Sequence, residues 1–540
     1  MRTLVIGIDA ACREVLQPLF EAGVTPRLRS VFGGGASGPL KSGIPPWTAS
    51  AWPTIYTGKN PGKHGVFDML AYDGYDWDVV NATHVRARPV WELLDRFGFS
   101  SVAVNVPVTH PPGSFDGALV PGFLAPNAPR CHPEGLLGEV RAEIGDYRVY
   151  PDDRALRAGN TESALRVLRM RGAAFRYLAD RFDPDFGFVE FQQTDAVFHK
   201  RPGDREAVEA VYRTVDEQVG AILDELDPDN VLVVSDHGMG PYDDYEFRIN
   251  EFLRERGFVT AKRGGQGMPA WTTIKEERLA LDSPGPRGRR PLESRGRRLL
   301  EAGVAAAARV GVTTQRVADL LDSLGLAEAV GRRVPHGLLQ AGSEQVDFPA
   351  SRAYARSRSE LGVRLNLEGR EPDGTVPRSA YEAVRAELVE ALESVRTPDG
   401  DPVFEAVGPR EAFFEGPHVE DAPDVVTVPN GFEQLLSVQL AGDVFGEPTE
   451  PYNHKRHGIV AATGEDIDAE AGVEGAHILD VTPTVLATFD VPRGTEMDGR
   501  PLPVVADPGE REYPDYDATR TERTDSRRIE ARLSELGYIE

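Results

Sequence analysis

The stretch VLVVSDHGMG, residues 231–240, carries a run of apolar residues directly into two ionisable side chains. Residues 231–234 are apolar without alternation, which is typical of a parallel strand covered on both faces. The run is followed at once by Asp236 and His237. A carboxylate and an imidazole are both good metal ligands when deprotonated. The stretch therefore predicts a buried parallel strand with a metal-binding group at its end.

Further strand-like and helical segments alternate along the chain on both sides of this stretch. Because strands that alternate with helices build parallel sheets, we expect an α/β fold with a mostly parallel sheet flanked by helices. The α/β pattern returns after residue 457, with an apolar run at 458–463 and a helical pattern at 482–489 that we expect to belong to the same α/β core. The other strand-like runs are 3–8, 101–106 and 186–191, and the other helical patterns are 88–97, 163–181 and 206–226.

The composition of the sequence changes near residue 260, where Gly, Pro and Arg become frequent. Because 540 residues exceed one ordinary core, we expect two domains or one domain with an insertion. The predicted division is a catalytic core at 1–258 plus 450–507, an inserted α+β cap region at 259–449, and a charged C-terminal tail with a short helix at 508–540. Helices are expected in the inserted region at 297–310, 315–330 and 379–395.

The composition excludes some classes of partner. The 86 acidic and 60 basic residues give a formal net charge of -26, which argues against a nucleic-acid backbone as the partner. An acidic surface poor in lysine fits either adaptation to high salt, as in halophilic proteins, or a skewed genome composition. Two cysteines make no disulfide framework. Neither a secretory signal nor an apolar stretch of membrane-spanning length is present, so we expect a cytoplasmic protein without a membrane partner.

Three separate strand-like runs end in potential metal ligands. Asp9 follows the first run, Asp195 and His199 follow the run at 186–191, and Asp236 and His237 follow the run at 231–234. A single Asp after a strand is more often a helix cap or turn former. In an open parallel sheet, however, ligands bind outside the carboxyl ends of the strands. The joint occurrence of these residues at strand ends therefore predicts a metal site.

The segment SGIPPWTASAWPTIYTGKNPGKHG, residues 42–65, is a second signal. It is rich in proline, glycine and hydroxyl groups, which is typical of a turn-rich surface loop, but its aromatic residues indicate that it is packed. A hydroxyl at the start of the helix-like AWPTIYTG would lie where the helix N-terminus favours a phosphate or an alkoxide. Thr48 is the predicted nucleophile, and Ser50 is the alternative.

These motifs, taken in order, resemble the type I phosphodiesterase and nucleotide pyrophosphatase family of the alkaline phosphatase superfamily. The resemblance spans about residues 1–258 and 450–503 and implies an alkaline-phosphatase-like core. Weaker likenesses occur at NVPVTHPP (105–112), NLEGREPDG (366–374) and DVTPTVL (480–486). The motifs that carry it are Asp9, Thr48 followed by TG-x2-P-x2-HG, TD-x3-H at 194–199, SDHGM at 235–239 and HKRHG at 454–458.

The resemblance implies a site for two divalent metal ions. His454 is preferred to His457 as the late ligand because family members place it four residues before a glycine that starts a strand, here Gly458. Asn105 either donates a hydrogen bond to a phosphoryl oxygen or caps a turn. Mixed Asp and His ligation suits zinc best, with manganese or iron possible. The implied ligands are Asp9, Thr48, Asp236 and His237 for one ion, and Asp195, His199 and His454 for the other.

The function expected on these grounds is metal-dependent hydrolysis of a phosphodiester or pyrophosphate bond. The substrate would be a small-molecule phosphate ester of the nucleotide or nucleotide-sugar type, cleaved through a covalent phospho-threonine at Thr48. The alternatives within the superfamily are a phosphomonoesterase, a phosphoglycerate-mutase-like enzyme and a phosphonate hydrolase. A non-catalytic binding protein is the alternative from another class. The leaving group and the oligomeric state are not predicted.

Overall fold

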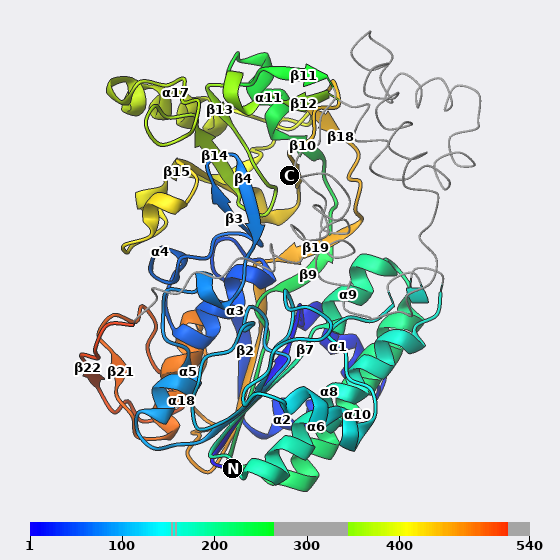
Figure 1. Ribbon diagram of the computed structural model, residues 1–540. Coiled ribbons are helices and arrows are strands. Elements are labelled where there is room, and N and C mark those ends of the chain that lie inside the picture. The colour runs from blue at the N-terminus through cyan, green and yellow to red at the C-terminus, as the bar shows by residue number, and fades with distance from the viewer. Residues whose placement is uncertain (153–154, 157–158, 264–343, 517–540) are drawn as a thin grey trace, which may run out of the picture.

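The computed structural model describes residues 1–152, 155–156, 159–263 and 344–516 of the chain (Figure 1). The helices predicted at 297–310 and 315–330, and the tail from residue 517 on, lie outside the described residues. Within the described part, no helix combines the length and the apolar character needed to cross a membrane.

The central sheet has seven strands in the order β2-β20-β8-β1-β7-β5-β6. Strands β8, β1, β7, β5 and β6 are parallel to one another, whereas β20 is antiparallel to both β8 and β2. The predicted α/β fold with a mostly parallel sheet is therefore confirmed. The strands are β1 (Thr3–Ile8), β2 (Ala36–Lys41), β5 (Ser101–Val104), β6 (Gly117–Val120), β7 (Phe186–Phe191), β8 (Asn230–Val234) and β20 (His457–Gly464).

Helices cover both faces of this sheet (Figure 1). Successive residues of β1 belong to opposite faces, with Leu4 and Ile6 in one apolar cluster and Val5 in the other. Both clusters are buried, which explains why the central strands are apolar without alternation. One face is covered by α1 (Arg13–Glu21), α2 (Pro26–Gly34), α6 (Leu136–Ile144), α8 (Glu162–Phe182) and α10 (Arg205–Leu226), and the other by α3 (Thr48–Thr57), α5 (Val90–Asp95) and α18 (Val481–Thr488).

Smaller sheets lie above the carboxyl ends of the central strands (Figure 1). An antiparallel sheet in the order β13-β14-β16-β15 packs against the helix α17, and a second sheet has the order β17-β10-β18. This arrangement matches the α+β character predicted for the inserted region. The elements are β10 (Glu246–Arg248), β13 (Ala353–Tyr354), β14 (Gly362–Leu365), α17 (Tyr381–Glu393), β15 (Phe404–Pro409), β16 (Val425–Pro429), β17 (Leu435–Ser437) and β18 (Phe445–Gly446).

The predicted domain division stays a prediction, but residues before the predicted boundary at 258 pack with residues of the inserted region. Phe247, Ile249 and Phe252 lie before residue 258 but pack into the apolar cluster of the upper sheets. Phe252 belongs to α11 (Ile249–Glu255), so this helix is part of the upper region. Trp47, from the lower part of the chain, joins the same cluster and ties the two regions together.

A two-stranded ribbon connects the central sheet to the upper region. It pairs β9 (Gly238–Pro241) with β19 (Tyr452–Lys455) in antiparallel fashion and places His454 opposite Met239. The ribbon continues from β8 on one side and leads into β20 on the other, so it lies at the carboxyl edge of the sheet. The helices α4 (Pro61–His64) and α9 (Gln193–Lys200) also lie near this edge. Elsewhere, the start of the charged tail forms the strand β22 (Glu510–Arg511), which pairs with β21 (Arg493–Gly494).

Candidate metal centre

Three neighbouring strands end at one place and deliver the predicted ligands there. Asp9 follows β1, Asp236 and His237 follow β8, and Asp195 lies on α9 just after β7. Because β7, β1 and β8 are adjacent and parallel, their carboxyl ends meet at the same edge of the sheet. Asp9, Asp236 and His237 are fully buried, so these ionisable groups lie inside the protein rather than on its surface.

The first group of predicted ligands converges on the imidazole of His237. Its Nε2 lies 3.1 Å from Asp236 Oδ2, 3.5 Å from Asp9 Oδ1 and 3.3 Å from Thr48 Oγ1. Its Nδ1 lies 3.0 Å from the carbonyl oxygen of Gly238, which holds the ring with Nε2 toward the carboxylates. Burial lowers the pKa of His237, but Asp236 outweighs it and the pKa is raised. The carboxylates around His237 therefore favour a positive charge at this place.

The second group consists of Asp195, His199 and His454. Asp195 Oδ1 lies 3.2 Å from His199 Nε2 and 3.3 Å from His454 Nε2, and the two Nε2 atoms are 3.3 Å apart. The spacing of four residues puts Asp195 and His199 on one face of α9. His454 Nδ1 lies 3.0 Å from the carbonyl oxygen of Pro46, so its Nε2 is directed at the carboxylate. Three donor atoms thus face one point.

The residues present fit divalent metal ions. Asp9 Oδ1 and Asp236 Oδ2 are buried, and the imidazole of His237 is the only polar partner that the described residues offer them. Burial raises the pKa of Asp9 well above its ordinary value, and the carboxylates of Asp236, Asp195 and Glu190 raise it further. Buried carboxylates that crowd together are costly unless a cation lies between them. Carboxylate oxygens with imidazole nitrogens form a donor set that zinc and similar ions prefer.

Thr48, rather than Ser50, directs its hydroxyl at these groups. Thr48 is the first residue of α3 and its Oγ1 lies 3.3 Å from His237 Nε2. The hydroxyl of Ser50 donates a 2.8 Å hydrogen bond to the carbonyl oxygen of Val66 and is therefore already used. The helix begins at Thr48, before the stretch AWPTIYTG (51–58) that was predicted to be helical, and the side chain at its first position faces the predicted metal ligands.

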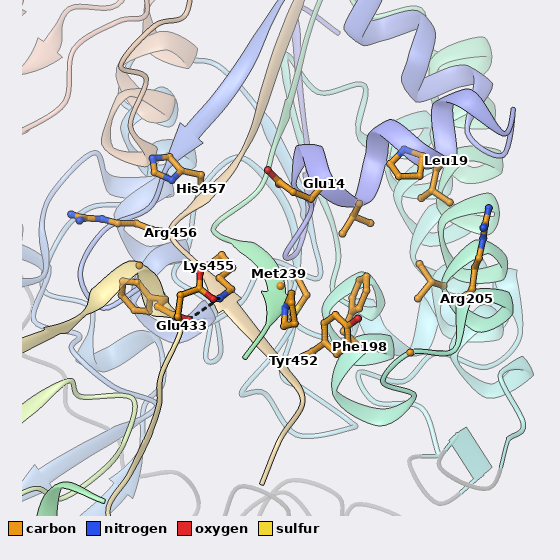
Figure 2. A pocket seen from close by; sticks show the side chains of 18 of the residues that line it. Glu14, Leu19, Phe198, Arg205, Met239, Glu433, Tyr452, Lys455, Arg456 and His457 are labelled. Atoms are coloured by element: carbon orange, nitrogen blue, oxygen red, sulfur yellow. Dashed lines mark hydrogen bonds and ion pairs between the residues drawn. The ribbon is translucent and has the colours of Figure 1, made fainter. Parts of the chain in front are cut away.

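The structure separates His454 from His457. His454 is buried within the second group of ligands, whereas His457 is exposed and pairs with Lys41 across β20 and β2. His457 lines a separate cavity of about 900 Å³, where it lies beside Arg456 (Figure 2). His454 and the other preferred ligands do not line this cavity, although Phe198 and other lining residues are their close neighbours in the chain.

Asn105 lies against a buried carboxylate that sequence reasoning missed. Its Nδ2 is 2.5 Å from Glu190 Oε2 and 3.3 Å from the carbonyl oxygen of Glu190, so both amide protons are directed at this residue. Asn105 adopts a left-handed conformation with φ 65° just after β5. The phosphoryl contact considered for Asn105 stays a prediction, and its amide nitrogen pairs with Glu190 in this structure. The only sequence signal was an acidic residue inside the apolar strand GFVEF.

Two further residues support Asp9, although neither was predicted as a site residue. Trp52 Nε1 donates a 3.4 Å hydrogen bond to Asp9 Oδ2, and Thr194 Oγ1 donates a 2.6 Å hydrogen bond to the backbone oxygen of Asp9. Gly7 makes room for the indole, because a Cβ at this position would lie 2.4 Å from the ring of Trp52. Such contacts fix the orientation of a metal-binding carboxylate.

The chain matches the model of one known protein family and shares its fold with a solved structure. The family model of type I phosphodiesterase / nucleotide pyrophosphatase matches residues 3–300. Phosphonoacetate hydrolase from Sinorhizobium meliloti 1021, solved with phosphonoformate, has a TM-score of 0.51 and 16% identity over 89% of this chain and 94% of that one, which shows a shared fold. Murine ectonucleotide pyrophosphatase / phosphodiesterase 5, solved with AMP, has a TM-score of 0.49 and 11% identity over 94% and 97% of the two chains. No curated protein matches.

Proposed function

Because the chain belongs to the type I phosphodiesterase / nucleotide pyrophosphatase family, we propose that it hydrolyses a phosphodiester or pyrophosphate bond of a nucleotide-type substrate, with Thr48 as the nucleophile. The family lies within the alkaline phosphatase superfamily, and its members are hydrolases. The observation that carries the proposal is the position of Thr48 Oγ1, 3.3 Å from His237 Nε2 at the edge of the buried carboxylate cluster.

The proposed reaction has two displacements at phosphorus. In the first, Thr48 Oγ1 forms a bond to phosphorus while the bond to the leaving oxygen breaks, and the hydroxyl proton passes to the leaving oxygen or to solvent. In the second, water attacks the phospho-threonine, phosphate ester is released and the Thr48 hydroxyl is restored. Thr48 is the first residue of a ten-residue helix, so the positive end of α3 faces the phosphoryl group.

The proposed site would hold two divalent ions. When bound, the ions would lower the pKa of the threonine hydroxyl and stabilise the attacking and leaving oxygens. The mixed Asp and His donor set favours zinc, with manganese or iron as alternatives. The residues proposed to hold them are Asp9, Thr48, Asp236 and His237 for one ion, and Asp195, His199 and His454 for the other.

The test is hydrolysis of bis-p-nitrophenyl phosphate and of p-nitrophenyl phosphate by protein that has been stripped with a chelator and refilled with zinc or manganese. The proposal predicts metal-dependent cleavage in which the diester reacts faster than the monoester. Thr48→Ala should remove this activity, while the matched variant Thr463→Ala, on β20 away from the site, should keep it. Faster cleavage of the monoester than of the diester would refute the proposal, and so would cleavage at the same rate with and without metal.

A further inference from the structure

A short loop of the upper region, residues 356–360, approaches the nucleophile segment. Ser359 Oγ donates a 2.6 Å hydrogen bond to Asp68 Oδ1, and Asp68 lies in the chain just beyond the segment that begins at Thr48. Ala355 and Leu361, which flank the loop, share an apolar cluster with Trp47, the residue directly before Thr48. The loop is therefore tied to Asp68 by Ser359, and both of its flanks are buried in the apolar cluster that also contains Trp47.

The loop is held by its own buried ion pair. Arg356 and Glu360 form this pair with side-chain exposures of 6% and 2%, and the Arg356 guanidinium lies 3.9 Å from the ring centroid of Tyr72. Arg358, between them, differs because its side chain is 42% exposed. The buried residues thus anchor the loop, and Arg358 is its exposed residue.

Arg358 forms an ion pair with a residue that borders the second group of metal ligands. Arg358 Nη1 lies 2.9 Å from Glu450 Oε1, and Asn453 Nδ2 donates a 2.9 Å hydrogen bond to Glu450 Oε2. The next residue, His454, donates its backbone N–H to Asn453 Oδ1 at 2.8 Å. Burial acts to raise the pKa of Glu450, but Arg358 and then His199 outweigh it and lower the pKa. Glu450 therefore lies within electrostatic reach of His199.

His199 marks the open side of the site. Its side chain is 24% exposed, whereas the side chains of Asp195 and His454 are each 9% exposed. A substrate that reaches the proposed metal ligands from solvent would pass His199, and Glu450, the ion-pair partner of Arg358, interacts electrostatically with His199. A guanidinium has five N–H donors in a planar fork, so a pairing through Nη1 leaves donors for a second oxyanion.

We propose that Arg358 binds a second anionic phosphate next to the scissile phosphoryl group, so that the preferred substrate is an organic pyrophosphate rather than a singly charged diester. This inference rests on the proposed function and selects one bond type within it. Bidentate contact between arginine and phosphate supplies both charge and orientation. Glu450 limits the attraction, because its carboxylate competes for the same guanidinium.

The test compares three substrates in one metal-loaded preparation: a dinucleoside pyrophosphate, the phosphodiester of the same two nucleosides, and bis-p-nitrophenyl phosphate. For the wild type, kcat/KM should be higher for the pyrophosphate than for the matched diester. Arg358→Ala should lower kcat/KM for the pyrophosphate about 10- to 100-fold, because a hydrogen bond to a charged group is lost and Glu450 then repels the substrate. The values for the two diesters should change less than about threefold.

Two further variants separate binding from folding. Glu450→Gln should lower KM for the pyrophosphate, because it frees the guanidinium while keeping an acceptor for Asn453. Arg352→Ala is the matched control, since Arg352 is similarly exposed at 43% and pairs with Glu387 at 3.5 Å in the same region. It should leave all three values unchanged.

The outcomes distinguish this inference from the proposed function. If the wild type cleaves none of the three substrates in the presence of metal, the proposed function fails. If it cleaves them but shows no preference for the pyrophosphate, or if Arg358→Ala lowers all three values equally or none of them, only the role of Arg358 is refuted.

Discussion

The imidazole rings of His237 and His454 stack with their centroids 3.6 Å apart and 16° between their planes. Each ring belongs to a different group of proposed ligands, so the stack joins the two halves of the site. Two protonated imidazoles would repel each other at this distance. Burial, followed by the charge of His237, lowers the pKa of His454 to about 4. His454 is therefore neutral at neutral pH, as a metal ligand must be.

The two hydroxyls on the first turn of α3 should respond differently to mutation. Thr48→Ala should lower kcat for bis-p-nitrophenyl phosphate by at least about 1,000-fold, because it removes the proposed nucleophile. Ser50→Ala should keep most of the activity and cost about 1 kcal/mol of unfolding free energy, since it removes a buried hydrogen bond to Val66. Steady-state kinetics with urea unfolding checks both; loss of activity in Ser50→Ala with wild-type stability would favour serine as the nucleophile.

Trp52 should support metal affinity through Asp9. Trp52→Phe keeps an aromatic ring but removes the 3.4 Å hydrogen bond to Asp9 Oδ2, so zinc affinity should fall about tenfold. Trp91→Phe is the matched control, because Trp91 is also buried, at 3% exposure, in the same apolar cluster. Competition for zinc with a coloured chelator measures both affinities. Equal affinities in the two variants would show that the indole does not act on the carboxylate.

Asp424 should make the stability of the upper region depend on pH. Both oxygens of this buried carboxylate lie 2.7 Å from the guanidinium of Arg370, in the stretch 366–374 that resembles the family. Burial would raise the pKa of Asp424, but Arg370 outweighs it and lowers the pKa to about 2. A carboxylate with a depressed pKa in the folded state stabilises that state above its unfolded pKa of about 4. This contribution, about 2.5 kcal/mol, is lost as the pH falls through about 2.

Asp424→Asn should therefore flatten the pH dependence of the unfolding free energy between about pH 4 and pH 2. At neutral pH it should cost about 3–5 kcal/mol, because Arg370 and Arg410 both lose a buried carboxylate partner. Urea unfolding across this pH range measures both effects. Asp421→Asn, which changes a carboxylate whose side chain is 69% exposed, is the control. A slope in Asp424→Asn as steep as in the control would show that Asp424 does not carry this pH dependence.

The sequence was sufficient for features that depend on local pattern. The strands β1 and β7 have the predicted bounds, and β8 begins one residue earlier than predicted, because apolar runs between turn residues mark parallel strands. Asp9 and Asp236 could be assigned to one place because the carboxyl ends of parallel strands share an edge. The family resemblance supplied the order of the motifs, and the family match agrees with it.

Contacts between distant segments could not be predicted from the sequence. The pairing of Asn105 with Glu190 depends on β5 and β7 being neighbours, and the approach of Arg358 to Glu450 depends on how the upper region packs. No local pattern encodes either contact. The orientations of Thr48 and Ser50 follow from backbone geometry at the start of α3, which residue type alone does not determine.

The most direct test of the two-ion site is the zinc content of three proteins, measured by elemental analysis after dialysis against a low concentration of zinc. We expect two ions per chain in the wild type, about one in His454→Ala, and two in His457→Ala, because only His454 lies within the ligand groups. The activity on bis-p-nitrophenyl phosphate should fall with the lost ion and stay unchanged in His457→Ala. Two ions in His454→Ala, or the loss of an ion in His457→Ala, would contradict the site described here.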